Sequence, residues 1–443
     1  MFDTQPFYLY NILVMKNFKK VVSLMLILST TLALSGCTTF NNFKYAFFGG
    51  NSTNKETTIK IGVYEPMSGE YSKQGKEEIA GIELAHELFP EVLGKKIELI
   101  YADNKSNMDD AKSALETLYA QNPDIVIGSY GEVFTIMNGD YAKASSTPSI
   151  AVTSVNPLIT KNNEYYFTTT FSEEKQGEAL ADYAVKGIGA KKFATVKLYN
   201  DDTAQAVIKR FANRLKKIAD DKEPIVASVN LEHAAQDYTS AINYLKESKV
   251  GCVLLATSEA VSEKFITQCE EQGYTYPLFI GTKDWDNETF RAFALQHPIM
   301  SFAFATEKTI VDTERYEVLH SAYDEKYGSD TEPTAVMALG FDAYSLAYRT
   351  LEKTGEWIDE GAENKYISKD ASEAEIKAIR QAVEESKKTG IPAGPILRAG
   401  LKSIIHFKGA SGIITFVDSN EATKTITIAQ YIRGIEYPQY VVE

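Results

Sequence analysis

The chain has 443 residues, a hydrophobic content of 44% and a clear excess of acidic side chains. Its 60 Asp and Glu residues against 46 Lys and Arg give a formal net charge of −14 at pH 7. This balance argues against a nucleic-acid-binding protein, because no basic stripe is available to neutralise phosphates. It also argues against a polybasic membrane-binding patch. The length exceeds what one hydrophobic core usually supports and predicts two domains.

The N-terminal segment has the layout of an export signal. Lys16, Lys19 and Lys20 precede an apolar run over residues 21–34, and small residues follow it. The run is shorter than the ~20 apolar residues that a transmembrane helix needs. A second methionine, Met15, stands directly before the first lysine, so it is a candidate for the true initiator.

The tetrad Leu-Ser-Gly-Cys at 34–37 ends this run and resembles the bacterial lipobox, in which the Cys thiol receives a diacylglycerol and becomes the first mature residue. An uncleaved anchor beside a chance cysteine is the alternative. We predict a lipoprotein signal peptide over 1–36, lipid attachment at Cys37 and a polar tether over 37–56, which make the protein extracytoplasmic and membrane-anchored. Cleavage would remove Asp3 and three lysines and change the formal charge from −14 to −16.

From residue 58 onward, short β-branched runs alternate with segments of helical period. This alternation predicts parallel sheets with helices on both faces. In a first unit we expect strands at 59–64, 96–101, 124–128 and 149–152, and helices at 77–89, 109–120 and 134–144. In a second unit we expect helices at 176–186, 206–218, 238–247 and 260–272, and strands at 193–198, 225–230, 250–256 and 278–281. Two such units predict an α/β protein with two Rossmann-like lobes.

Two extended segments, 165–171 and 301–306, are expected to cross between the lobes. Helices at 313–327 and 334–353 follow the second segment. Residues 361–390 are rich in Glu, Lys, Ser and Ala, which predicts a solvated surface helix inserted in a loop. Strands at 412–416 and 425–433 end the chain.

The sequence lacks the motifs that indicate an enzyme or a metal protein. No Gly-x-Gly-x-x-Gly follows a strand, no Gly-x-x-x-x-Gly-Lys-Ser/Thr occurs, and no Gly-x-Ser-x-Gly elbow is present. The five histidines are far apart in sequence, and a surface or capping role suits each better than metal ligation. Cys252 and Cys269 are expected to be two buried thiols rather than a disulfide. We therefore expect no catalytic residues, no metal and no cofactor.

Polar groups follow the predicted strands of both units. They lie at 64–69, 129–132 and 153–157 in the first unit, and at 199–202, 257–259 and 282–285 in the second. Open α/β sheets bind ligands at the carboxyl ends of their strands, so these segments predict a ligand site. Ordinary turns and helix caps are the alternative, and for Asp201, Asp202 and Glu259 it is equally well supported.

Five motifs, in this order, resemble the type I solute-binding proteins. They are Ile-Gly-Val-x4-Ser-Gly at 61–69, Val-Ile-Gly at 126–128, Thr-Ser-Val-Asn-Pro at 153–157, Phe-x4-Gln-Gly at 171–177 and Ala-Leu-Gly-Phe-Asp-Ala at 338–343. The pattern is most similar to the leucine/isoleucine/valine-binding proteins of amino-acid ABC transporters, and it extends from about Lys60 to Phe416.

The resemblance implies a type I periplasmic binding protein fold, in which two lobes joined by a multi-strand hinge close on a ligand. On this scheme the N-lobe comprises 57–170 and 307–411, with the helical insert at about 361–390, and the C-lobe comprises 171–306 and 412–443. The resemblance also implies a monomer that delivers its ligand to a membrane permease.

The ligand site implied by the resemblance carries unexpected residues. The hydroxyl position that holds the amino-acid carboxylate falls on Glu132, which would repel a carboxylate. The clamping threonine falls on Val155, and the acid that receives the ammonium aligns with Lys283, beside Asp284. We therefore expect the scaffold to carry over and the α-amino-acid clamp to be lost. The expected ligand-binding residues are Tyr71, Gln74, Tyr130, Gly131, Glu132, Thr153, Ser154, Val155, Tyr199, Ser258, Lys283 and Asp284.

These features predict a lipid-anchored substrate-binding protein of an ABC importer, whose ligand is a small polar solute such as an amino-acid-like compound, an amide or an amine. Glu132 and Asp284 with Tyr71, Tyr130 and Tyr199 would suit a cationic ligand. In the alternative, Glu132 caps its helix and faces solvent. A ligand sensor for a membrane signalling partner and a degenerate envelope protein also stay open. An enzyme is the least supported class.

Overall fold

The computed structural model describes residues 58–156, 158–171, 173–306, 313–361, 365–367, 371–416 and 419–442. The predicted signal peptide, Cys37 and the tether lie outside the described residues. Residues 57–443 form one compact unit. Among the helices described, none has both the length and the apolar character that a membrane span requires.

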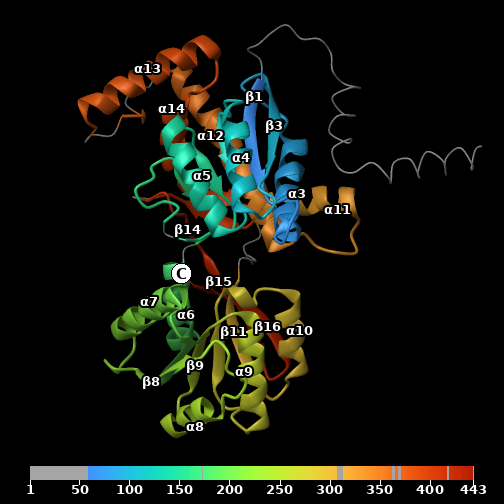
Figure 1. Ribbon diagram of the computed structural model, residues 1–443, viewed down its shortest axis with the longest axis vertical. Helices are drawn as coiled ribbons and strands as arrows, with labels where there is room; N and C mark the ends of the chain where they lie inside the picture. Colours follow the sequence, from blue (N-terminus) through green and yellow to red (C-terminus); the bar gives the residue numbers. More distant parts are fainter. Residues whose placement is uncertain are drawn as a thin grey trace, which may run out of the picture. The chain divides into compact units, whose positions relative to one another are not determined.

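The first sheet has six strands in the order β2-β3-β1-β4-β5-β6. Its strands β1 and β3 lie side by side (Figure 1). A parallel array is formed by β1 (Thr58–Glu65), β3 (Lys95–Asp103), β4 (Ile125–Ile127), β5 (Ser149–Ala151) and β6 (Tyr166–Thr168). The short strand β2 (Glu91–Val92) pairs antiparallel at one edge. We call this sheet and the helices packed on it the first lobe.

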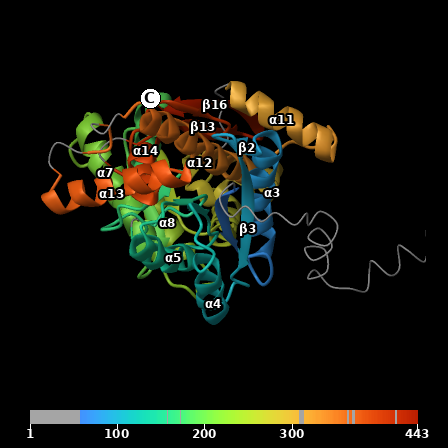
Figure 2. The same cartoon turned by 90° about the horizontal axis from the view of Figure 1, so that it is seen from above.

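Both faces of this sheet are covered, so its strands are almost continuously apolar. On one face, Ile59, Ile61 and Val63 share a core with residues of α3 (Ser72–Leu88) and α12 (Ala335–Asp359). On the other face, Tyr64 and Val126 pack with residues of α4 (Met108–Tyr119) and α5 (Glu132–Ser145). Figure 2 shows α4 and α5 on one side and α11 (Glu314–Tyr327) and α12 on the other.

The second sheet has seven strands in the order β16-β15-β11-β10-β9-β7-β8. Its parallel strands are β7 (Phe193–Leu198), β8 (Ile225–Leu231), β9 (Cys252–Ala256), β10 (Leu278–Gly281) and β11 (Ser301–Thr306). At one edge, β15 (Ile426–Ile432) and β16 (Ile435–Val442) add antiparallel. We call this sheet and its helices the second lobe. The helices are α6 (Glu173–Asp182), continued by a π turn over Tyr183–Gly187, α7 (Asp202–Ile218), α8 (Thr239–Ser248), α9 (Glu259–Glu271) and α10 (Glu288–Gln296).

The last third of the chain returns to the first lobe before it ends in the second. After α13 (Glu373–Thr389) and α14 (Gly394–Lys402), a small sheet forms from β12 (Phe407–Gly409), β13 (Gly412–Thr415) and β14 (Thr423–Lys424). Ile414, Phe416 and Ala422 belong to the same hydrophobic core as Ile59. The boundary expected after residue 411 is therefore too early, because the chain joins the second sheet only at β15.

The predicted strands 59–64, 193–198 and 278–281 agree with β1, β7 and β10 to within a residue or two at either end. The expected crossover segments contain the sheet strands β6 and β11, and after each of them the chain continues in the other lobe, with α6 and α11 respectively. The insert helix was predicted to be solvated, which is wrong for one of its faces. Ile379, Ala382 and Val383 of α13 pack against Trp357, Tyr366 and Ile396.

Helices α3 and α12 cross at a point where neither carries a side chain. A Cβ on Gly81 would lie 2.0 Å from the Met337 carbonyl oxygen, and one on Gly340 would lie 2.3 Å from the Glu78 carbonyl oxygen. Real Cβ atoms do not approach backbone this closely, so only glycine permits the contact. The crossing fixes the position of α3, which carries Glu78 toward the carboxyl ends of the strands.

Replacing Gly81 by Ala is expected to lower the free energy of unfolding by about 2 kcal/mol, because the new methyl group overpacks the crossing. Denaturant unfolding measures the change. Gly251→Ala is the matched control, since a Cβ there meets no atom within 4 Å; it should stay within about 0.5 kcal/mol of the wild type. Equal effects of the two substitutions would contradict the role of this crossing.

Candidate ligand-binding site

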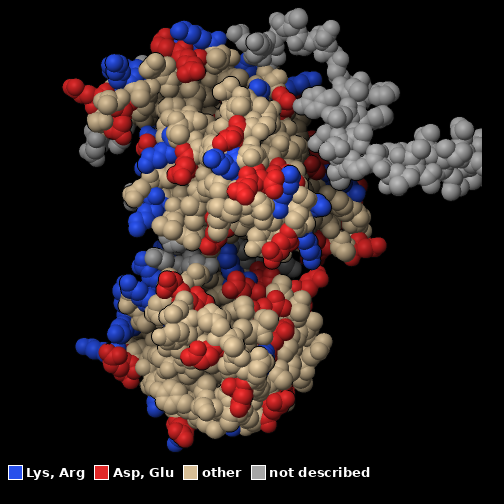
Figure 3. Space-filling model, viewed as in Figure 1, with Lys and Arg blue, Asp and Glu red and all other residues tan. Residues whose placement is uncertain are grey.

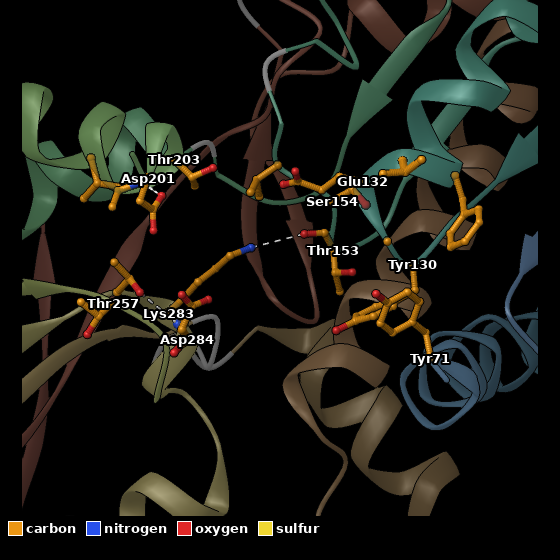
Figure 4. Close-up of a pocket in the computed structure, with 18 of the residues that line it drawn as sticks. Tyr71, Tyr130, Glu132, Thr153, Ser154, Asp201, Thr203, Thr257, Lys283 and Asp284 are labelled. Atoms are coloured by element: carbon orange, nitrogen blue, oxygen red, sulfur yellow. Dashed lines mark hydrogen bonds between the residues drawn. The ribbon is translucent and has the colours of Figure 1, made fainter. Parts of the chain in front are cut away.

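A cavity of about 760 Å³ opens at the carboxyl ends of the parallel strands of both sheets (Figure 4). The loops after β1, β3, β4 and β5 line it from the first lobe, and the loops after β7, β9 and β10 line it from the second. Strand ends are where α/β sheets bind ligands, and this volume lies in the range of small-molecule sites.

Ten of the twelve predicted residues line the cavity: Tyr71, Tyr130, Gly131, Glu132, Thr153, Ser154, Val155, Ser258, Lys283 and Asp284. Gln74 and Tyr199 are not among the lining residues. The Tyr199 side chain is 51% exposed, whereas Gln74 Oε1 is buried on α3 and has no hydrogen-bond donor among the described residues. Contact of the ten residues with a ligand stays a prediction.

A network of hydroxyl groups holds the first-lobe wall. The Asn104 side chain donates to Ser129 Oγ at 2.8 Å, and the Thr135 hydroxyl donates to the Ser129 carbonyl oxygen at 2.6 Å. The Ser154 hydroxyl lies 2.8 Å from that of Thr135. These bonds fix the loop that presents Tyr130. The Tyr130 ring lies 5.9 Å, centroid to centroid, from the Tyr71 ring, so the wall has an aromatic surface.

Glu132 begins α5 and lines the cavity, so it is not simply a solvent-facing helix residue. Its Oε2 accepts a hydrogen bond from the Asn156 side chain at 3.0 Å. A carboxylate in the first turn of a helix is favoured by the helix dipole. The negative charge of Glu132 is therefore held in place at the wall of the cavity.

Lys283 connects the two walls. Its backbone N–H donates to Gln176 Oε1 of α6 at 2.5 Å, which anchors it in the second lobe. Its ammonium donates to the Thr153 carbonyl oxygen of the first lobe at 3.3 Å. Figure 4 shows the Lys283 side chain extended toward Thr153. This bond joins the two lobes directly across the site.

Acidic groups outnumber basic ones around the cavity. Glu70, Glu132, Asp201 and Asp284 line it, and Lys283 is the one Lys or Arg among the described lining residues. Figure 3 shows acidic side chains along the edges of the hollow between the two lobes. Within the described residues, no group of three or more His, Cys, Asp or Glu is placed to hold a metal ion. Cys252 and Cys269 are buried free thiols, as predicted.

Two fully buried carboxyl groups, missed by the sequence analysis, lie behind the first-lobe wall. The Tyr130 backbone N–H donates to Glu65 Oε2 at 2.7 Å, and the Thr153 hydroxyl donates to Glu78 Oε1 at 2.5 Å. The two carboxyl groups also hydrogen-bond each other, which requires a proton on one of them. Burial raises the pKa of both groups, and for Glu65 the charge of Glu78 raises it further.

This acid pair predicts that the protein becomes less stable as the pH rises from 5 to 8. Burial raises the pKa of Glu78 from 4.5 to about 7, so in this window the folded protein holds protons that the unfolded chain has released. The free energy of unfolding therefore falls with pH, by an amount on the order of 2 kcal/mol for one such group. Thermal unfolding at a series of pH values measures the slope.

Glu78→Gln should flatten this dependence, because the amide keeps an acceptor for Thr153 and removes the titrating group. Glu83→Gln is the matched control, since Glu83 lies on the same helix and accepts a hydrogen bond from the Tyr101 hydroxyl instead; it should keep the wild-type slope. A slope that Glu78→Gln leaves unchanged would show that the pair does not hold the proton.

The family model for periplasmic binding proteins matches residues 58–434. The chain belongs to this family. Leu/Ile/Val-binding protein homolog 8 of Brucella abortus is 20% identical over 346 residues, which cover 76% of this chain and 81% of that protein. Homolog 3 of Brucella melitensis is 25% identical over 142 residues, and there the chain spans only 39% of the relative's length.

Solved structures show the same fold. The leucine-binding protein LivK from Thermotoga maritima superposes with a TM-score of 0.64 at 21% identity, covering 87% of this chain and 99% of that chain. A solute-binding protein from Rhodopseudomonas palustris in complex with benzoate gives a TM-score of 0.60 at 17% identity, covering 87% and 98%. The predicted two-lobed type I periplasmic binding protein fold is confirmed.

Proposed function

We propose that this periplasmic binding protein is the extracytoplasmic substrate-binding component of an ABC importer and captures a small polar solute between its lobes. The main support is the cavity, to which strand-end loops of both sheets contribute. A solute held there touches both lobes at once, so its binding favours the arrangement in which they are close. A membrane permease then accepts the loaded protein, and the solute leaves chemically unchanged.

The size and polarity of the cavity support a solute in the range of an amino acid, an amide or an amine. Its wall offers the hydroxyl groups of Thr153, Ser154, Thr257 and Ser258 and the aromatic surface of Tyr71 and Tyr130. Pockets of this kind use a few polar groups to orient a ligand against an apolar surface. The solved relatives named above bind leucine and benzoate, which are of comparable size.

Thermal unfolding of the full chain in detergent, against a panel of amino acids, amides, amines, betaines, nucleosides and short peptides, tests this function. A ligand that binds only the folded protein, at a hundred times its dissociation constant, stabilises it by ~2.7 kcal/mol. We expect at least one panel member to raise the melting temperature. The proposal fails if no member does so.

We also propose that Cys37 carries the lipid that holds the protein at the membrane. The basis is the tetrad at 34–37 after a short apolar run. In cells, Cys37→Ser should move the protein from the membrane fraction to the soluble extracytoplasmic fraction, and mass spectrometry should find no lipid on it. Cys252→Ser is the control, because that thiol is buried in β9. Membrane retention of the Cys37→Ser protein would contradict the anchor.

A further inference from the structure

Behind the ligand wall, three buried side-chain oxygens have no hydrogen-bond donor among the described residues other than the proton that the two carboxyl groups share. They are Glu65 Oε1, Glu78 Oε2 and Gln74 Oε1. Glu78 lies four residues after Gln74 on α3, so the two side chains lie on the same face of the helix. Buried acceptors normally have a donor, and charged ones are costly without a partner. The acid pair therefore keeps its shared proton unless a positive charge nearby compensates the second negative charge.

We infer that Glu65 and Glu78 determine the substrate class of this site, which is a solute that carries a cationic group and lacks a free carboxylate. The inference rests on the proposed solute-binding function and specifies its ligand. Glu65 and Glu78 are positioning residues here, since they act through Tyr130 and Thr153, which line the cavity, and do not line it themselves.

The single lysine of the described lining does not offset this acidic character. Lys283 donates to the carbonyl oxygen of Thr153, and the hydroxyl of the same residue donates to Glu78. The lysine charge is thus directed at the acid pair, with Thr153 between them. A ligand carboxylate would have to compete with Glu78 for Lys283 and would also face Glu132 and Asp284.

A cationic group meets the opposite conditions. It is attracted by the lining carboxylates, and the faces of Tyr71 and Tyr130 add a cation–π surface. A positive charge in the cavity also favours the ionised form of the acid pair, so binding releases the proton that the two carboxyl groups share. The charged and titratable groups that face Glu78 are Glu65 on β1, Glu77 on its own helix, Tyr130 after β4 and Lys283 from the second lobe.

Two consequences follow for binding. Because the acid pair carries more negative charge at high pH, the affinity for a cationic ligand rises between pH 5 and pH 8. In that range, binding releases a fraction of a proton. Replacing a residue that has only a structural role would change neither the pH profile of the affinity nor the proton release.

Isothermal titration calorimetry with matched probes tests the inference on the full chain in detergent. Each probe pair is an amino acid and the amine left when its carboxylate is removed: leucine and 3-methylbutylamine, lysine and cadaverine, arginine and agmatine. The wild type is expected to bind at least one amine at least about tenfold more tightly than the matching amino acid. A factor of this size corresponds to one hydrogen bond to a charged group. Titration in buffers of different ionisation enthalpy should show proton release on amine binding.

Glu78→Gln should reduce both the preference for the amine and the proton release, whereas Glu83→Gln, on the same helix but bonded to Tyr101, should keep them. Glu65→Gln is a second variant of the same pair, for use if Glu78→Gln does not fold. The proton release on amine binding is measured on the wild type, so it tests the inference without any variant. Tighter binding of an amino acid than of its amine, or amine binding without proton release, overturns the inference and leaves solute binding intact. The absence of binding by all six probes and by the panel described above contradicts the proposed function itself.

Discussion

The hydrogen bonds from Tyr130 to Glu65 and from Thr153 to Glu78 connect the ligand wall to the core of the first lobe. Glu78 can lie there only because α3 and α12 meet backbone to backbone at two glycines, Gly81 and Gly340. The carbonyl oxygen of Thr153 in turn accepts a hydrogen bond from the ammonium group of Lys283 in the second lobe. A continuous series of contacts therefore extends from a helix crossing deep in the first lobe to the residue that joins the lobes.

Two buried carboxyl groups in contact lower the stability of a fold. Each loses its hydration, and their mutual repulsion prevents both from ionising freely. An apolar pair of similar size would stabilise the same position better. Such groups are concentrated at functional sites, where charge is needed more than stability. The location of this pair directly behind the residues that line the cavity is consistent with that general pattern.

The fold could be predicted in large part because its signals are local. Strands such as β1 and β7 are short apolar runs between helical segments, and the order of the motifs identified the family. The edge strand β16 was missed because Glu436, Tyr437 and Pro438 give it no apolar alternation, and proline is tolerated there only at an edge. The buried face of α13 was missed because its partners, Trp357 and Ile396, are distant in sequence.

The candidate site was predictable where residues directly follow strands, as Tyr130, Thr153 and Lys283 do. Tyr199 also directly follows a strand, β7, but its side chain is exposed. Gln74 was placed at the cavity from the resemblance, but its side-chain oxygen is buried on α3. Glu65 and Glu78 could not be recognised as a pair, since they are thirteen positions apart in sequence. Only the packing of α3 against the sheet brings their carboxyl groups together.

A solute bound between the lobes should draw them together, and a measured distance between the lobes tests this most directly. Spin labels on Glu116→Cys in α4 and Asn243→Cys in α8, both exposed positions, report that distance by electron paramagnetic resonance in a Cys37→Ser chain, where the two remaining cysteines are buried. We expect a shorter and narrower distance distribution when a stabilising solute is added. An unchanged distribution at a saturating concentration of a solute that binds would contradict it.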